Sequence, residues 1–130
     1  MEENLKEIGD KLRYKECPEL YRNIIQIQDT LDVLSGKWKI PILFAILKGH
    51  SRFSDIVDFC PGITDKVLNN RLKDLIDNKI IAKRGYDYIM TEHGVSLYRV
   101  IQELWRWGCR HRYVMLGEEL PPDVYSEQLQ

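Results

Sequence analysis

The spacing of apolar residues predicts a long first helix that ends near residue 34. Apolar residues recur there at intervals of four, three, four and three positions: Leu20, Ile24, Ile27, Leu31 and Leu34. This spacing gathers them on one side of a helix, and the resulting seam is suited to packing against another helix. Pro18 is tolerated at a helix start, and Ser35-Gly36 ends the element.

Two more helices and a turn are predicted between residues 37 and 63. The segment KWKIPILFAILKGH, which starts at Lys37, is apolar on nearly every side, so its helix should lie at the centre of the core. Pro41 is tolerable only near the start of this helix, and Gly49 marks its end. The next segment, SRFSDIVDFC, predicts a short extended piece and a short helix, and the Cys-Pro-Gly sequence at 60–62 predicts a turn.

The segment GITDKVLNNRLKDLIDNK predicts a helix from Thr64 to Asn78 with one apolar and one polar side. Thr64 is a favourable N-cap. The apolar side consists of Leu68, Leu72, Leu75 and Ile76. The opposite side and its flanks carry amides and cations: Lys66, Asn69, Asn70, Arg71 and Lys73. Either water or a polyanion could face this mixture, and the neighbouring elements decide between the two.

A β-hairpin and a last helix are predicted after residue 79. The segment IIAKRGYDYIMT is rich in β-forming residues around an Arg-Gly-Tyr-Asp turn, so two short strands are expected. Thr91 is the expected N-cap of one long final helix. One apolar stripe of this helix is expected to dock on the core: Leu97, Ile101, Leu104, Trp105 and Gly108. A second stripe beside it indicates a further partner: Val100, Trp107 and Val114.

This order of elements predicts a mainly α fold with a small β-hairpin (α+β). It is the order of a winged helix-turn-helix with extra N- and C-terminal dimerisation helices. The domain is expected over residues 17–116, between an N-terminal extension at 1–16 and an acidic, flexible tail at 117–130. In this fold the second helix of the motif, here Thr64–Asn78, enters the DNA major groove, and the 83–87 hairpin is a short wing. Asn is suited to pairing with adenine, and Lys or Arg with guanine or phosphate.

Charge is distributed unevenly along a chain whose net charge is only −1. Residues 37–86 hold ten Lys/Arg against five Asp/Glu, whereas the segments on both sides of them are acidic. A basic segment of this kind is typical of a polyanion footprint, although a solvated mixed surface would show the same balance. No aromatic residue lies on the outward face of the Thr64–Asn78 helix, which disfavours single-strand binding by base stacking.

Other classes of function find little support in the sequence. No Gly-rich phosphate loop, paired-carboxylate motif or catalytic Cys/His spacing is present, so an enzyme is not expected. The three cysteines are too far apart for a disulfide framework, and Cys109 with His111 is a weak metal signal, so no metal and no cofactor are expected. Because no apolar run could span a bilayer and no signal-peptide pattern opens the chain, a soluble cytoplasmic protein is expected.

Several motifs together resemble those of HxlR-type regulators, which are dimeric winged-helix transcription factors related to the MarR group. The motifs are Cys17-Pro18, LDVLSGKW at 31–38, SRFSDI at 51–56, PGITDKVLNNRLKDL at 61–75 and YIMTEHG at 88–94. Trp107-Gly108 match the closing pair of the family's terminal dimer helix. The hairpin is shorter than the usual family wing and lacks its Pro-rich middle.

The resemblance implies a homodimer that binds a near-palindromic operator in double-stranded DNA and represses transcription by blocking polymerase. The expected DNA-binding residues are Arg52, Thr64, Lys66, Asn69, Asn70, Arg71, Lys73, Lys83 and Arg84. The expected dimer interface contains Ile24, Ile27, Leu31, Val100, Leu104 and Trp107.

Cys17 is a candidate redox sensor, because some members of this family sense oxidants through an N-terminal cysteine. A helix N-terminus also lowers the pKa of a thiol and favours the reactive thiolate. Whether the effector is an oxidant or another small molecule is left open by the sequence. The alternative function is a winged-helix protein-interaction module without specific DNA binding. Salt-sensitive binding to duplex DNA separates the two functions, because neutralising phosphates releases counterions.

Overall fold

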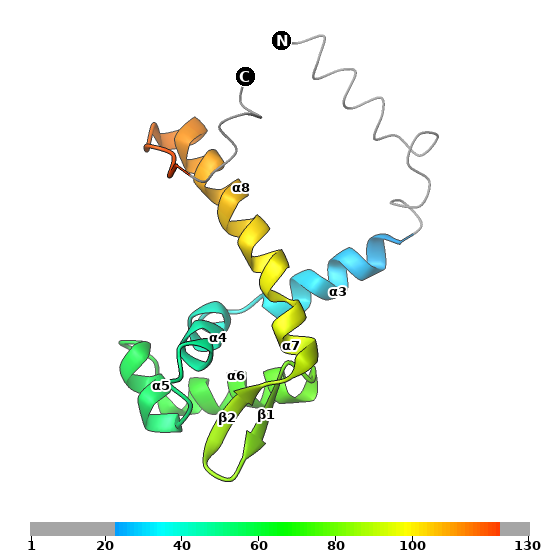
Figure 1. The fold of residues 1–130 in the computed structure, drawn as a ribbon, viewed down its shortest axis with the longest axis vertical. Coiled ribbons are helices and arrows are strands. Elements are labelled where there is room, and N and C mark those ends of the chain that lie inside the picture. Colours follow the sequence, from blue (N-terminus) through cyan, green and yellow to red (C-terminus); the bar gives the residue numbers. More distant parts are fainter. Residues whose placement is uncertain (1–22, 123–130) are drawn as a thin grey trace.

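The structure is a computed structural model that describes residues 23–122. In chain order its elements are α3 (Ile24–Leu34), α4 (Lys39–Leu47), α5 (Phe53–Phe59), α6 (Asp65–Asp77), β1 (Ile81–Arg84), β2 (Asp87–Met90), α7 (Glu92–Ser96) and α8 (Tyr98–Leu116). The predicted mainly α fold with one β-hairpin is confirmed (Figure 1). The extension at 1–16, Cys17 and residues 123–130 of the tail lie outside the described residues.

Helix α4 lies at the centre of the core, as its uniformly apolar sequence predicts. Ile42 and Ala45 are fully buried and Leu43 nearly so, and the helix packs against α5 and β2. The apolar side of α6 closes the core from another direction through Leu68, Leu72 and Leu75. Pro41 falls in the first turn of α4, where its missing N–H breaks no helical hydrogen bond.

Helices α5 and α6 form the helix-turn-helix corner. The turn between them contains Gly62, whose φ of +94° lies in the left-handed region that glycine adopts without strain. Thr64 then caps α6, because its side-chain oxygen accepts a hydrogen bond from the Val67 N–H at 3.2 Å. The predicted N-cap and start of this helix are therefore confirmed.

Strands β1 and β2 form the wing in a four-pair antiparallel register that runs from Ile81↔Met90 to Arg84↔Asp87. Two residues make the turn, and the first of them, Gly85, has a positive φ of 60°, as tight hairpin turns require. The start of β2, next to the turn, is attached to the residues before α5. The Tyr88 N–H donates to the Ser51 carbonyl at 2.8 Å, and the Ser51 hydroxyl donates to the Asp87 carboxylate at 2.9 Å.

The predicted single helix after Thr91 is wrong, because the structure divides this segment into α7 and α8 at Leu97. Thr91 caps α7 by accepting from the Gly94 N–H at 2.9 Å, and its own N–H donates to the Ile80 carbonyl at 3.1 Å. These bonds hold α7 against Ile80, the residue directly before β1. The N–H of Leu97 bonds the carbonyl of Gly94, three residues back, so the helix tightens there and α8 begins separately.

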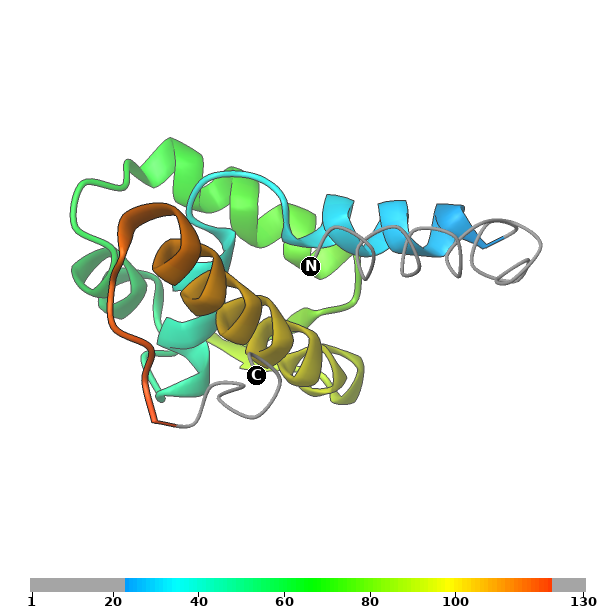
Figure 2. The same ribbon diagram turned by 90° about the horizontal axis from the view of Figure 1, so that it is seen from above.

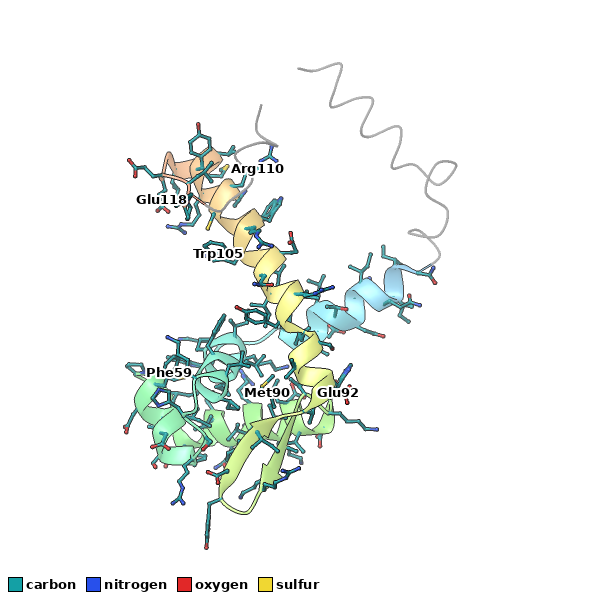
Figure 3. The ribbon with its side chains drawn as sticks, viewed as in Figure 1. Phe59, Met90, Glu92, Trp105, Arg110 and Glu118 are labelled. Carbon is teal, nitrogen blue, oxygen red and sulfur yellow. The ribbon has the colours of Figure 1, made fainter. Side chains whose placement is uncertain are left out.

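Helices α3 and α8 extend away from the body formed by α4, α5, α6 and the wing (Figure 1). The second view shows α3 projecting to one side (Figure 2). The expected docking of the α8 stripe on the core is correct for Leu97 and Ile101, which pack against buried residues. It is wrong for Leu104 and Trp105, which remain 43% and 50% exposed, because α8 has left the body at this point (Figure 3). None of the helices in residues 23–122 is long and apolar enough to cross a membrane.

Candidate nucleic-acid interface

The outward face of α6 presents the polar side chains that the sequence singled out. Lys66, Asn69, Asn70 and Lys73 are all exposed, while the opposite side of the helix is buried in the core. Within residues 23–122, none of these four side chains is held by another side chain. Both amides and both ammonium groups are therefore available to an external ligand.

A hollow of about 450 Å³ lies beside this face, between α6, the start of α5 and the wing. Its lining brings together cations and an amide from three separate elements: Arg52, Asn69 and Lys83. Phe53, Ser54, Tyr86 and Tyr88 complete the lining. The sequence predicted the individual residues, and the attachment of the wing to α5 brings them together.

Arg52 is oriented across the hollow by contacts with the wing. Its Nε lies 3.8 Å from the Asp87 carboxylate, and its guanidinium lies 6.0 Å from the centroid of the Tyr86 ring. The arginine side chain remains 65% exposed, so an ion pair this long and solvated contributes little to stability. What the contacts supply is an orientation for the positive charge.

The wing carries two cations and one exposed aromatic ring. Lys83 lies on β1 with its Nζ 5.5 Å from the centroid of the Tyr88 ring, and Arg84 is the exposed last residue of β1. Tyr86 is 79% exposed at the tip. Sequence reasoning considered aromatic residues only on α6 and missed Tyr86, although its place in a two-residue turn was a usable signal.

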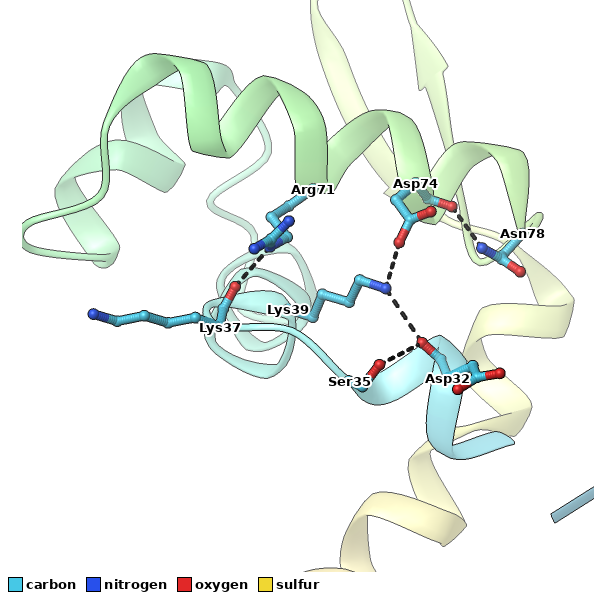
Figure 4. Close-up of polar contacts among 7 residues, drawn as sticks. All are labelled: Asp32, Ser35, Lys37, Lys39, Arg71, Asp74 and Asn78. Carbon is cyan, nitrogen blue, oxygen red and sulfur yellow. Dashed lines mark hydrogen bonds and ion pairs between the residues drawn. The ribbon is translucent and has the colours of Figure 1, made fainter. Parts of the chain in front are cut away.

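Arg71 occupies a different environment from the other predicted DNA-binding residues. Its Nε donates to the main-chain carbonyl of Lys37 at 2.8 Å, so the guanidinium lies against the connection between α3 and α4 (Figure 4). The side chain is half-buried. Thr64 is exposed, but its oxygen is engaged by the cap. Arg71 and Thr64 therefore differ from the four outward-facing side chains of α6, because both are already hydrogen-bonded within the protein.

Cys60 is the buried cysteine of the described chain and lies at the end of α5. It is 1% exposed, and burial raises the pKa of its thiol. The neutral thiol is therefore favoured, and the residue packs as a small apolar group. No group of three or more metal-ligating side chains occurs among residues 23–122, so Cys109 and His111 gain no third ligand there.

A second surface, on α3 and α8, is apolar and exposed. All six residues expected at a dimer interface lie on it with exposures between 37% and 61%: Ile24, Ile27, Leu31, Val100, Leu104 and Trp107. A hollow of about 560 Å³ adjoins it between α4 and α8, and its lining includes Phe44, Ile101 and Trp105. Exposed large apolar side chains gathered on two helices are typical of a protein–protein contact.

Comparison with known proteins identifies the family. The HxlR-like helix-turn-helix family matches residues 33–115, which include the corner, the wing and most of α8. The chain belongs to the HxlR-like helix-turn-helix family. Among curated proteins, the HTH-type transcriptional regulators YkvN and YtcD of Bacillus subtilis are 34% and 33% identical over 107 and 101 residues. These matches cover 77% and 72% of this chain and 91% and 80% of the relatives.

Solved structures with a similar fold include those of two regulators. The redox regulator HypR in its reduced form is 29% identical with a TM-score of 0.64, and the match covers 72% of this chain and 99% of that one. Quinone-bound YodB from Bacillus subtilis is 30% identical with a TM-score of 0.62, and the match covers 65% and 97% of the two chains. The relatives of this HxlR-like chain are transcriptional regulators, so the prediction of this family is confirmed.

Proposed function

We propose that this HxlR-like chain binds double-stranded DNA in a sequence-specific manner and regulates transcription as a dimeric repressor. The observation that carries the proposal is the outward face of α6. Lys66, Asn69, Asn70 and Lys73 are exposed on a helix that follows a helix-turn-helix corner. One of them, Asn69, lines the hollow that contains Arg52 and Lys83.

Side-chain chemistry supports different tasks for the amides and the cations of α6. A major groove about 12 Å wide admits an α-helix, and Asn can pair with adenine through both groups of its amide. We therefore assign base contacts to Asn69 and Asn70 and phosphate or guanine contacts to Lys66 and Lys73. This division follows from the chemistry of the side chains and from their shared position on one side of α6.

The hollow beside α6 is a suitable binding site for a phosphate group of the DNA backbone. Arg52 and Lys83 approach it from the start of α5 and from the wing, and a phosphate would neutralise their positive charges. Asp87 offers only a loose ion pair to Arg52, at 3.8 Å. Arg84 and Tyr86 extend the same surface to the wing tip. With α6 in the major groove, these residues would follow the adjacent backbone.

Dimerisation is supported by the exposed apolar surface on α3 and α8. A two-fold dimer would cover the same surface on both copies and leave both α6 helices free, so a near-palindromic operator would match the symmetry of the protein. Occupying such a site excludes polymerase, and the proposed function takes place in the cytoplasm with the DNA.

A response to oxidants through Cys17 is a second, separate proposal. It is favoured by the similarity to a redox regulator and to a quinone-bound protein, although Cys17 itself lies outside the described residues. Peroxide or quinone should weaken DNA binding by the wild type and leave Cys17→Ser unaffected. Oxidant-insensitive binding by the wild type would remove this proposal and leave the DNA-binding proposal intact.

The test of DNA binding compares Asn70→Ala with Lys73→Ala on a selected duplex and on random duplexes at several salt concentrations. Asn70→Ala should weaken the selected site by roughly 1–3 kcal/mol and relax the preference at one base pair. Lys73→Ala should weaken all duplexes alike and reduce the salt slope by about one. If both folded, dimeric variants bind as the wild type does, α6 is not the helix that contacts DNA, and the interaction-module alternative is favoured.

A further inference from the structure

Two polar contacts connect α6 to neighbouring residues at the start of α4 and in the connection before it (Figure 4). In the first, the Lys39 ammonium forms an ion pair with Asp74. In the second, the Arg71 Nε donates to the Lys37 carbonyl at 2.8 Å. Arg71 and Asp74 are three residues apart, so they lie on the same flank of α6. Neither contact belongs to the outward face of the helix.

Lys39 is the buried charged residue of the described chain, with 4% of its surface exposed. Its Nζ also lies 3.4 Å from the main-chain carbonyl of Asp32, in the last turn of α3. One ammonium group therefore connects α3, α4 and α6. A buried charge is costly unless it is paired. Replacing a whole buried ion pair with apolar residues is often neutral or stabilising, whereas removing one partner alone is destabilising. The pairing instead specifies one geometry for three helices.

The second contact depends on an unusual main-chain conformation. Trp38 has a φ of +80°, in a region that bulky residues rarely adopt. This torsion sets the direction of the preceding carbonyl, that of Lys37, which accepts the Arg71 hydrogen bond. Gly36, two residues earlier, has a φ of +104°, which glycine adopts without strain, and a Cβ at this position would make only ordinary contact with the Arg71 Nε, at 3.5 Å. Strain at such a position is typical of a functional constraint.

We propose that these two contacts form a brace that fixes the angle between α6 and α3, and that Lys39, Arg71 and Asp74 are positioning residues for operator recognition. The inference rests on the proposed function, in which α6 enters DNA and α3 lies in the dimer interface. In a dimer, the angle between these helices sets the separation and the tilt of the two α6 helices. The brace therefore determines which half-site spacing the dimer accepts.

The test measures binding to a series of duplexes in which two copies of one selected half-site are separated by spacings that change one base pair at a time. The wild type should prefer one spacing by about tenfold or more over its neighbours. Asp74→Asn and Arg71→Lys should each flatten this preference, while the slope of log affinity against log salt stays unchanged. Arg71→Lys keeps the positive charge, so a residue that only neutralised a phosphate would show no change.

Two comparisons separate positioning from other effects. Asp77→Asn makes the same charge change on α6 at an exposed side chain for which the described residues supply no hydrogen bond or ion pair, so it should keep the wild-type spacing preference. The double variant Lys39→Met/Asp74→Asn removes the contact of Lys39 with the Asp32 carbonyl as well as the ion pair, so it should lose at least as much spacing preference as Asp74→Asn alone. Should Lys39→Met fail to fold, Asp74→Asn decides the question, since the Asp74 side chain is 49% exposed.

The inference is overturned if folded, dimeric Asp74→Asn and Arg71→Lys keep the spacing preference of the wild type. It is also overturned if both variants weaken binding equally at all spacings, which would indicate a general loss of affinity with no effect on half-site geometry. A wild type that shows no sequence preference at all would overturn the proposed function together with the brace. A selective wild type with unaffected variants would overturn the brace alone.

Discussion

Replacing Gly94 with alanine tests the attachment of α7 to the wing. A Cβ at residue 94 would stand 2.0 Å from the Ile80 carbonyl oxygen and 2.9 Å from its carbonyl carbon. Real Cβ atoms essentially never approach other atoms within 3.0 Å, and backbone cannot rotate away as a flexible side chain can. The alanine must therefore push α7 away from Ile80 by at least about 1 Å.

The expected cost follows from the contacts that this movement disturbs. The Ile80 carbonyl accepts from the Thr91 N–H at 3.1 Å, and the Thr91 hydroxyl caps α7 through Gly94. Overpacking against a rigid group costs about 1–3 kcal/mol, and loss of a cap costs about 1 kcal/mol. The gain from replacing glycine in a helix offsets about 0.5–1 kcal/mol of this. The free energy of unfolding should fall by about 1–3.5 kcal/mol.

Urea denaturation followed by far-UV circular dichroism measures this change, and Gly108→Ala is the matched control. Within the described residues no atom lies within 4 Å of a Cβ at Gly108, and this glycine is in the interior of α8. Gly108→Ala should therefore raise the free energy of unfolding by about 0.5–1 kcal/mol. A Gly94→Ala variant as stable as the wild type would refute the close packing of α7 on Ile80, directly before β1.

Three further changes test separate parts of the account. Thr64→Ala should lower the free energy of unfolding by about 1 kcal/mol through loss of one cap. Thr91→Ala should lower it further in the same urea titration, because the Thr91 hydroxyl also donates to the Ile80 carbonyl, and an equal loss for the two variants would contradict this. Leu104→Glu should give a monomer by light scattering with helicity retained, whereas Tyr86→Glu at the wing tip should stay dimeric. Cys60 should resist alkylation in the native protein because burial raises the pKa of its thiol. The buried neutral thiol contributes fully to stability below the pKa of the unfolded chain, about 8.5, and this contribution declines above that pH. The difference in unfolding free energy between wild type and Cys60→Ala should therefore shrink between pH 8 and pH 10, and a constant difference would count against the raised pKa.

Most of the fold could be predicted from periodicity and capping residues. The seam that ends at Leu34, the fully apolar α4 and the amphipathic α6 each follow from the spacing of apolar residues. Thr64 shows why the start of α6 was also predictable, since its hydrogen bond is made within the first helical turn. Interactions within one element depend on sequence neighbours alone.

The errors arose where an element is shaped by distant parts of the chain. The break at Leu97 follows from the bonds that hold Thr91 and Gly94 against Ile80, and no local pattern carries that information. Arg71 looked like its neighbours on α6, yet the Lys37 carbonyl, 34 residues earlier, holds it on another side. Lys39 had no distinguishing signal, because a lysine before an apolar helix is ordinarily solvated.

The central claim is specific binding of duplex DNA by the wild-type dimer, and one titration tests it most directly. A duplex obtained by selection from random sequences and an unselected duplex would be titrated with the full chain at several salt concentrations. Affinity for the selected duplex should be at least about 10³-fold higher, and both affinities should fall linearly with log salt. Equal affinities for the two duplexes, or no binding of either at low salt, would contradict the account.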